Sequence, residues 1–443
     1  MSRAPDTSSA SLRQALAGLL LLAGLALQVA RFMVPAISAS WVSYACWLAV
    51  ALLWMDIPRR TRLQAGCLAA IGVALLLAAR LQHDADIAWP RILEGNVYVV
   101  AMLLGVSFIG LIGNQRGRTR PLGRAVTGLR GSAGTWLGVH LLGSILNLST
   151  VFMVGDRLAR RGPLSAPQLL ALNRGLSSAA LWSPFFASMG VVMTLAPQMH
   201  FTTVLAFGMP LALLSGLIGT LELSRRYPLD EVAGFSLSPR SLAVPALLAA
   251  LVMLFHYVIT PRLTIVSIIT FLLPAVALCA NLPQGPRWLL GRVRQHSLER
   301  LPAMRGEVSL FLCAGLLTLG LSTYIDAATG SEWTLFETFG VSQAMLSFLA
   351  IVASSVAGLH PIIGVSVLAS MLDLPGERQT LFACVALASW AVGTSVGPLS
   401  GINLSLQGRY GVSGGRMMRD NLVYASAMTV AVVLALVLLN AWR

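Results

Sequence analysis

The chain has 443 residues, of which 56% are hydrophobic and only 11% are charged. A soluble domain carries about 25% charged residues, so this composition excludes a soluble enzyme, a disordered chain and a small disulfide scaffold. The net charge is +14, but the basic residues are arginines between apolar stretches, which argues against nucleic-acid binding. The five cysteines form no CxxC pair, and we expect no disulfide, metal or cofactor.

Apolar stretches long enough to cross a membrane predict an all-α polytopic membrane protein with eleven transmembrane helices. They fall at about residues 14–30, 36–55, 62–80, 95–113, 167–196, 202–222, 241–259, 263–281, 307–325, 379–408 and 421–441. The first stretch has no convincing cleavage site after it, so we expect a retained helix rather than a signal peptide.

The arginines test this arrangement, because cytoplasmic loops are enriched in positive charge. With the N-terminus in the cytoplasm, 24 of the 31 arginines lie inside and six outside, while Arg174 lies within a span. This distribution predicts a multi-pass protein of the bacterial inner membrane with a periplasmic C-terminus.

The distribution holds only if the apolar segment 134–154 does not cross the membrane, since arginine-rich loops flank both of its ends. We therefore predict a re-entrant hairpin that enters and leaves on the cytoplasmic side. Its middle, 143–150, has the small and polar residues of a tight turn. Unpaired backbone at membrane depth is tolerated only against protein or a water-filled cavity, so such a tip implies a cavity.

The segment 334–372 has acidic or mixed flanks and is too long for one helix across the bilayer. Gly358 and Pro361 interrupt its middle. It is predicted to be a second hairpin that enters from the outside.

The span after each hairpin is also predicted to be broken. Small residues and prolines stand at mid-membrane depth in both 167–196 and 379–408. The predicted helix breaks are Gly175, Pro184, Gly393, Gly397 and Pro398.

These segments predict an extra helix at 1–32 followed by two inverted repeats, 33–232 and 233–443. The arginine-rich linker 285–305 joins spans of the second repeat, and we expect it to lie at the cytoplasmic interface with Trp288 and Leu289 in lipid. Inverted repeats with paired interrupted helices are typical of secondary transporters whose site lies at the membrane midplane.

This layout resembles the ion transporter superfamily, which includes divalent anion–sodium symporters, arsenite efflux permeases and the membrane subunit of tripartite carboxylate transporters. The resemblance is one of topology. Where the symporters carry Ser-Asn-Thr at each hairpin tip, this chain has Asn147-Leu148-Ser149-Thr150, a loose echo, and Gly358-Leu359-His360-Pro361, a complete departure. The resemblance implies a homodimer that works by an elevator motion.

Helix termini at the tips and breaks favour anions, while unwound carbonyls and hydroxyls suit small cations. Small polar residues also let membrane helices pack closely, so both roles stay open for each one. The candidate substrate- and ion-binding residues are Ser144, Asn147, Ser149, Thr150, Ser177, Ser178, Ser183, Ser354, Ser355, His360, Thr394, Ser395, Ser400 and Asn403.

Two of the ionisable residues at membrane depth are candidates for an anion or proton partner. His360 precedes Pro361 near the second tip and either titrates or caps the backbone. Arg174 precedes the first break and either neutralises an anion or extends to the interface.

The sequence thus predicts a secondary active transporter of a small anion, a carboxylate or an oxyanion, coupled to protons or sodium. No catalytic residue is predicted. An efflux permease for a toxic oxyanion is the alternative within transport. An intramembrane enzyme acting on a lipid-linked substrate, or a channel, are alternatives from other classes.

Overall fold

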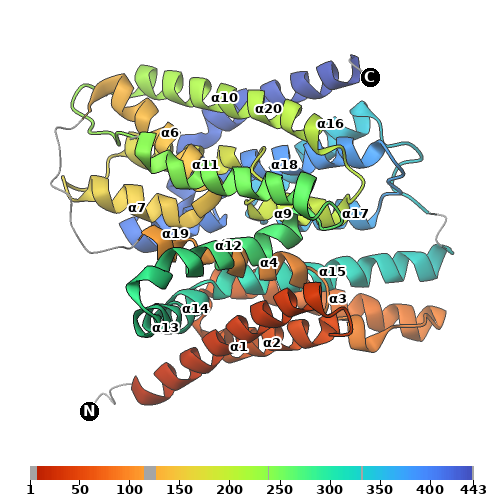
Figure 1. Ribbon diagram of the computed structural model, residues 1–443. Helices are drawn as coiled ribbons and strands as arrows, with labels where there is room; N and C mark the ends of the chain where they lie inside the picture. Colours follow the sequence, from red (N-terminus) through yellow and green to blue (C-terminus); the bar gives the residue numbers. More distant parts are fainter. Residues whose placement is uncertain (1–6, 114–125, 238, 331–332, 442–443) are drawn as a thin grey trace, which may run out of the picture. The chain divides into compact units, whose positions relative to one another are not determined.

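The computed structural model describes residues 7–113, 126–237, 239–330 and 333–441, and its regular elements there are helical (Figure 1). The long helices are α1 (Thr7–Met33), α2 (Ala39–Leu53), α3 (Arg59–His83), α10 (Phe201–Arg226), α11 (Pro239–Leu254), α12 (Ile265–Asn281), α15 (Arg305–Thr329), α18 (Arg378–Val396) and α20 (Gly414–Ala441). Shorter helices are α4 (Val97–Ser107), α6 (Gly128–Leu146), α7 (Leu148–Ala159), α8 (Ala166–Ala179), α9 (Ala187–Leu195), α13 (Pro286–Gln295), α14 (Leu301–Ala303), α16 (Val341–Val356), α17 (Pro361–Ser370) and α19 (Gly401–Tyr410).

The predicted fold class is confirmed: the chain is an all-α polytopic membrane protein. Within the described residues, nine helices are long and apolar enough to cross a membrane. The other two predicted spans are present as shorter pieces, 95–113 as α4 and 167–196 as α8 and α9. Arg116, Arg118, Arg120 and Arg124, which flank the predicted first hairpin, lie outside the described residues, as do Arg3 and Arg443.

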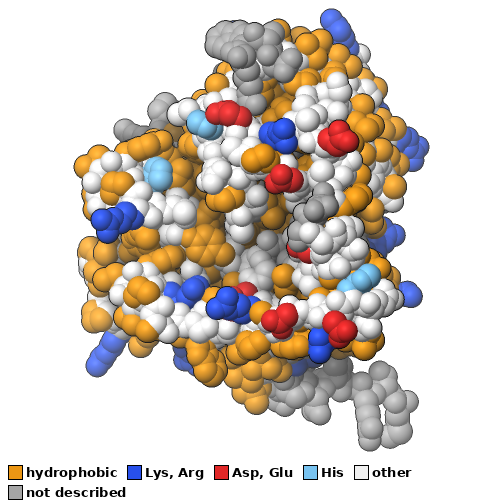
Figure 2. Space-filling view, turned by 90° about the vertical axis from the view of Figure 1, so that its right-hand side faces the viewer, with side chains coloured by type: hydrophobic (Ala, Val, Ile, Leu, Met, Phe, Trp, Pro, Cys, Tyr) orange, Lys and Arg blue, Asp and Glu red, His pale blue; other side chains and the backbone are white. Residues whose placement is uncertain are grey.

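Large apolar side chains are exposed along the candidate spans. On α10 and α20, for example, Leu213 is 67% exposed and Leu438 is 65% exposed. Figure 2 shows hydrophobic side chains over much of one face, with charged side chains between them. A water-soluble protein seldom leaves so much apolar surface uncovered, whereas hydrocarbon chains solvate it.

The chain folds into two compact units. Unit 1 consists of Met1–Gly117 and Val252–Trp333, and unit 2 consists of Arg118–Leu251 and Thr334–Arg443. Each unit therefore combines parts of both predicted repeats. The repeat boundaries themselves stay predictions.

Unit 2 contains two pairs of short helices at the positions of the predicted hairpins. We call α6–α7 hairpin 1 and α16–α17 hairpin 2. Within this unit they extend toward opposite ends (Figure 1). The interrupted helices follow them: broken helix 1 is α8–α9 and broken helix 2 is α18–α19.

In unit 1, the linker 285–305 forms α13, one π turn (His296–Arg300) and α14. The π turn packs on α1. His296 is buried, its Nε2 lies 2.9 Å from Ser107 Oγ, and its ring lies 4.6 Å from that of Phe108. Because Ser107 Oγ donates its proton to Leu104 O, it accepts from Nε2–H of a neutral imidazole. Burial, and then Arg300 and Arg292, lower the pKa of His296 to about 4.

This low pKa makes the stability of the chain depend on pH. Unfolded His has a pKa of about 6.5, so the unfolded state binds more protons between pH 6.5 and 4, and stability falls as the pH falls through that range. The loss at pH 5 is about 2 kcal/mol from this one group. We expect the melting temperature in detergent to fall less between pH 7.5 and 5 for His296→Gln than for the wild type. Identical pH profiles would contradict this account.

Candidate functional site

Every residue predicted to bind substrate or ion belongs to unit 2. The residues of the first half lie on hairpin 1 and broken helix 1, and those of the second half on hairpin 2 and broken helix 2. Unit 1 contains none of them. One compact body therefore carries the whole candidate site.

The turn of hairpin 1 lies against the interruption of broken helix 1. Asn147 separates α6 from α7 with a φ of 52°, a conformation that Asn adopts more readily than most residues. Its Nδ2 donates to the carbonyl of Phe185 at 3.0 Å. Ser183 Oγ donates to the carbonyl of Ser144. Both bonds satisfy carbonyls that would otherwise lack a partner at an interrupted helix. The structure thus brings together Ser144, Asn147 and Ser183.

His140 forms a closed polar cluster with broken helix 1. Its Nε2 accepts from Trp182 Nε1 at 3.1 Å, and its Nδ1 lies 2.8 Å from Ser178 Oγ. Because the indole N–H only donates, Nε2 is an acceptor and Nδ1 carries the proton. Ser178 Oγ in turn donates to Gly175 O at 3.0 Å. A Ser–His pair with the proton on the facing nitrogen is not a nucleophile and its base, so this cluster is structural.

Two buried hydroxyls near the first turn have no partner among the described residues. Thr150 is fully buried and Ser177 is 2% exposed, and neither side-chain oxygen forms a hydrogen bond. A Cβ built on Gly143 would lie 3.9 Å from the Cβ of Thr150 and 2.8 Å from Leu176, the neighbour of Ser177. Leaving a buried hydroxyl unpaired costs about 1–3 kcal/mol, so both oxygens have unused hydrogen-bonding capacity. Ser149 lies beside them in the first turn of α7.

Hairpin 2 turns at residues 357–360. Gly358 has a φ of 106°, which favours glycine. His360 caps α17, since its Nδ1 accepts from the backbone N–H of Ile362 at 3.2 Å, and its ring meets that of Trp390 edge-on at 5.4 Å. Ser354 and Ser355 both donate to Ile351 O at 2.8 Å. The hydroxyl protons of these two serines are therefore committed to their own helix.

Broken helix 2 is interrupted at Gly397-Pro398, and side chains satisfy the backbone around the break. Ser400 Oγ donates to Thr394 O at 2.7 Å, and Asn403 Nδ2 donates to Gly397 O at 2.9 Å. Ser395 Oγ donates within α18, to Val392 O. Helix α19 begins directly after the break, and Ser400 Oγ accepts from the backbone N–H of Asn403 in its first turn. Helix N-termini favour negative charge.

The predicted breaks at Gly175 and Gly393 need correction, since both residues lie inside helices, α8 and α18. Their role is close packing. A Cβ on Gly175 would lie 2.7 Å from Trp136 O of hairpin 1, and one on Gly393 would lie 2.7 Å from Ser355 Oγ of hairpin 2. Each broken helix therefore lies directly against its own hairpin through a glycine. The predicted breaks at Pro184, Gly358, Gly397 and Pro398 fall between helices, and Pro361 opens α17.

Arg174 is fully buried, and its charge already has a partner. Its Nη1 lies 2.7 Å from a carboxylate oxygen of Glu222, its Nε donates to Asn421 Oδ1 at 2.8 Å, and its guanidinium lies over the ring of Tyr424 at 4.6 Å. Glu222 also pairs with Arg226. The guanidinium thus forms part of an internal ion pair.

A chain of amides connects Arg174 to the second break. Asn421 Nδ2 donates to Ser395 O at 3.0 Å, and Asn173 Nδ2 donates to Asn403 Oδ1 at 2.7 Å. Sequence reasoning missed Asn173, Glu222 and Asn421, although a carboxylate and amides inside apolar spans were a usable signal.

A surface ion pair links hairpin 1 to broken helix 2. Asp156, at the end of α7, accepts from Arg409 Nη2 at 2.7 Å and from the hydroxyl of Tyr410 at 3.0 Å. Both partners lie at the end of α19. The first-half and second-half segments of unit 2 therefore meet at the ends of α7 and α19 as well as at the chain of amides.

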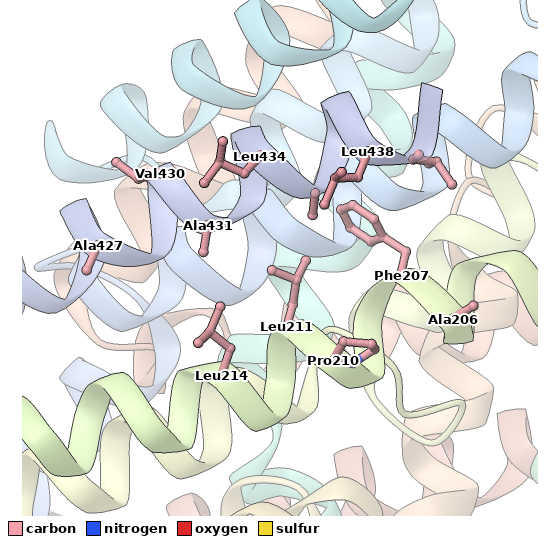
Figure 3. A pocket seen from close by; sticks show the side chains of 12 residues that line it. Ala206, Phe207, Pro210, Leu211, Leu214, Ala427, Val430, Ala431, Leu434 and Leu438 are labelled. Atoms are coloured by element: carbon pink, nitrogen blue, oxygen red, sulfur yellow. The ribbon is translucent and has the colours of Figure 1, made fainter. Parts of the chain in front are cut away.

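A cavity of about 690 Å³ lies elsewhere in unit 2, between α10 and α20. Figure 3 shows its lining, which is apolar and includes Phe207, Leu211, Val430 and Leu434. None of the predicted site residues lines it. A small anion needs polar groups to hold it, so we do not place the candidate site here.

Known proteins were compared with the chain by sequence and by structure. No protein-family model and no curated protein matches the chain. Among solved structures, the chain is similar to the YdaH transporter of Alcanivorax borkumensis, described as having an unusual topology. The two share 16% sequence identity over 87% of this chain and 98% of that chain, with a TM-score of 0.47.

The Arg174–Glu222 ion pair has a testable effect on stability. The test shows whether the charge of Arg174 is neutralised inside the protein or is available to bind an anion. Removing the carboxylate in Glu222→Gln leaves a buried guanidinium without its counter-ion, and we expect a loss of roughly 2–3 kcal/mol in the free energy of unfolding in detergent. Glu231→Gln, on an exposed loop, is the control and should change stability by less than about 0.5 kcal/mol. If Glu222→Gln were as stable as the wild type, the charge of Arg174 would be available for an anion.

Proposed function

We propose that the chain is a secondary active transporter of a small anion, a carboxylate or an oxyanion, that works by elevator-type alternating access. Its likeness to the ion transporter superfamily, noted from the sequence, belongs to this proposal, as does a homodimer in the bacterial inner membrane. This proposal assigns no catalytic role to the chain.

One observation carries the proposal: a single compact unit contains both hairpins, both broken helices and every candidate ligand. An elevator mechanism requires a body that carries the whole site. Each hairpin lies against its broken helix through Gly175 or Gly393, which favours movement of the two as one piece.

The chemistry of the breaks supports an anion as the substrate. The buried cation Arg174 is neutralised by Glu222, so the positive ends of helices are left to attract negative charge. The first turn of α19 offers such an end, and Ser400 caps it by accepting from Asn403 N. A coupling sodium ion would find oxygen ligands in the unpartnered hydroxyls of Thr150 and Ser177.

The structure offers a specific argument against the enzyme alternative. The Ser178–His140 pair resembles a catalytic pair in distance alone, because Trp182 fixes the imidazole with its proton facing the serine. No general base is then available to activate the hydroxyl.

Transport by reconstituted protein tests the proposal. Proteoliposomes would be supplied with mono-, di- and tricarboxylates and oxyanions, under an inward or outward gradient of sodium or protons. We expect one anion class to accumulate against its gradient. The direction of the sodium or proton gradient that drives accumulation distinguishes uptake from efflux. Ser177→Ala should lower sodium-driven transport about tenfold, which corresponds to the loss of about 1.4 kcal/mol of binding free energy with one oxygen ligand of the ion.

Ser347→Ala is the matched control. Its hydroxyl is also buried and unpartnered, but it lies on α16 well before the turn of hairpin 2. Both variants should keep the melting temperature of the wild type. Equal transport by the two variants would remove Ser177 from the site, and no transport of any anion would overturn the proposal itself.

Proton coupling has its own test in His360→Asn. The Oδ1 of Asn can replace Nδ1 as the acceptor for Ile362 N–H, so the cap of α17 survives while the titrating group is lost. If His360 carries the coupling proton, the variant should lose dependence on a pH gradient and keep its melting temperature. Unchanged pH-driven uptake would leave sodium, or another group, as the coupling partner.

A further inference from the structure

Helix α13 of unit 1 has no buried side chain. Its apolar residues Pro286, Leu289, Leu290 and Val293 follow the spacing of one helix face. Leu290 is 70% exposed. The apolar face of an amphipathic helix normally packs against protein or enters the surface of a membrane.

Basic side chains border this apolar face on the side of Leu290. Arg287 and Arg294 are exposed and stand two turns apart, while the guanidinium of Arg292 stacks over Trp288 at 5.5 Å. None of the three arginines forms an ion pair with another described residue. Arg287 and Arg294 are thus free to bind an anionic partner.

The chain keeps α13 close to a membrane surface. Only four residues, 282–285, separate it from α12, and these can reach at most about 14 Å. α12 is itself part of a candidate membrane span, Ile265–Gln284. After α13, the buried His296 and the packing of the π turn on α1 fix the helix within unit 1.

We propose that α13 binds the headgroup phosphates of anionic phospholipids through Arg287 and Arg294, with Leu290 at the level of the acyl chains. The charge of the arginines selects anionic over zwitterionic headgroups. The apolar face and the short tether to α12 favour a lipid over a soluble partner. Bound lipid would hold unit 1 at a fixed depth.

Native mass spectrometry of the purified full chain tests this binding. The detergent-solubilised protein would be titrated with phosphatidylglycerol, or with phosphatidylcholine of the same acyl chains as the neutral probe. We expect the wild type to retain phosphatidylglycerol preferentially, and Arg287→Gln/Arg294→Gln to weaken that binding by about tenfold. Binding of phosphatidylcholine should be the same for both proteins.

The control is Arg80→Gln/Arg91→Gln. It removes the same charge from the part of unit 1 that is predicted to face the periplasm. It should bind phosphatidylglycerol like the wild type. An equal loss in both double variants would reduce the effect to net charge and overturn the proposal. Displacement of the lipid by an equal concentration of inorganic phosphate would also overturn it, because an ion site would then be sufficient. All these side chains are exposed, so the variants should fold, and size-exclusion chromatography checks this.

Discussion

A backbone carbonyl at the end of an interrupted helix needs a donor, and inside a membrane water is not there to provide one. In unit 2 this constraint is met at Ser395, whose carbonyl accepts from the side-chain amides of Asn403 and Asn421. Asn421 is held in turn by Arg174, and Arg174 by Glu222. The break, the amides and the buried ion pair therefore form one connected arrangement. It provides donors for a carbonyl near the end of α18, which stops at Val396 in the interior of the protein.

The arrangement also explains why polar residues deep in unit 2 have different roles. Ser354, Ser355 and Ser395 donate to their own helices, which is how serine is accommodated in an apolar helix. Asn147 and Ser183 satisfy carbonyls across the contact between hairpin 1 and broken helix 1. Thr150 and Ser177 do neither. A ligand therefore needs both unused hydrogen-bonding capacity and a place near a turn or a break, and Ser347 on α16 has only the first.

The spans, the hairpin turns and the approximate places of the breaks could be predicted from the sequence, because hydropathy, Gly and Pro act locally. The glycine contacts could not: Gly175 and Gly393 read as breaks, yet they are helical and serve close approach. The partners of Arg174 could not be predicted from the sequence either, because Glu222 and Asn421 contact it only through tertiary packing. For the same reason the sequence suggested two consecutive repeats, whereas each compact unit combines segments of both.

The long reach of these bonds has a consequence for biogenesis. Arg174 precedes Glu222 by 48 residues and Asn421 by 247 residues. At about 5–20 residues per second, synthesis of the intervening chain to Asn421 takes roughly 10–50 s. During most of this interval Arg174 has Glu222 but not Asn421 as a partner, and the side chain of Asn173 lies at membrane depth without Asn403. The insertion machinery, or lipids and water near it, must shelter these groups until α20 arrives, so truncated chains that end before α20 should be recognised as unfinished by membrane quality control.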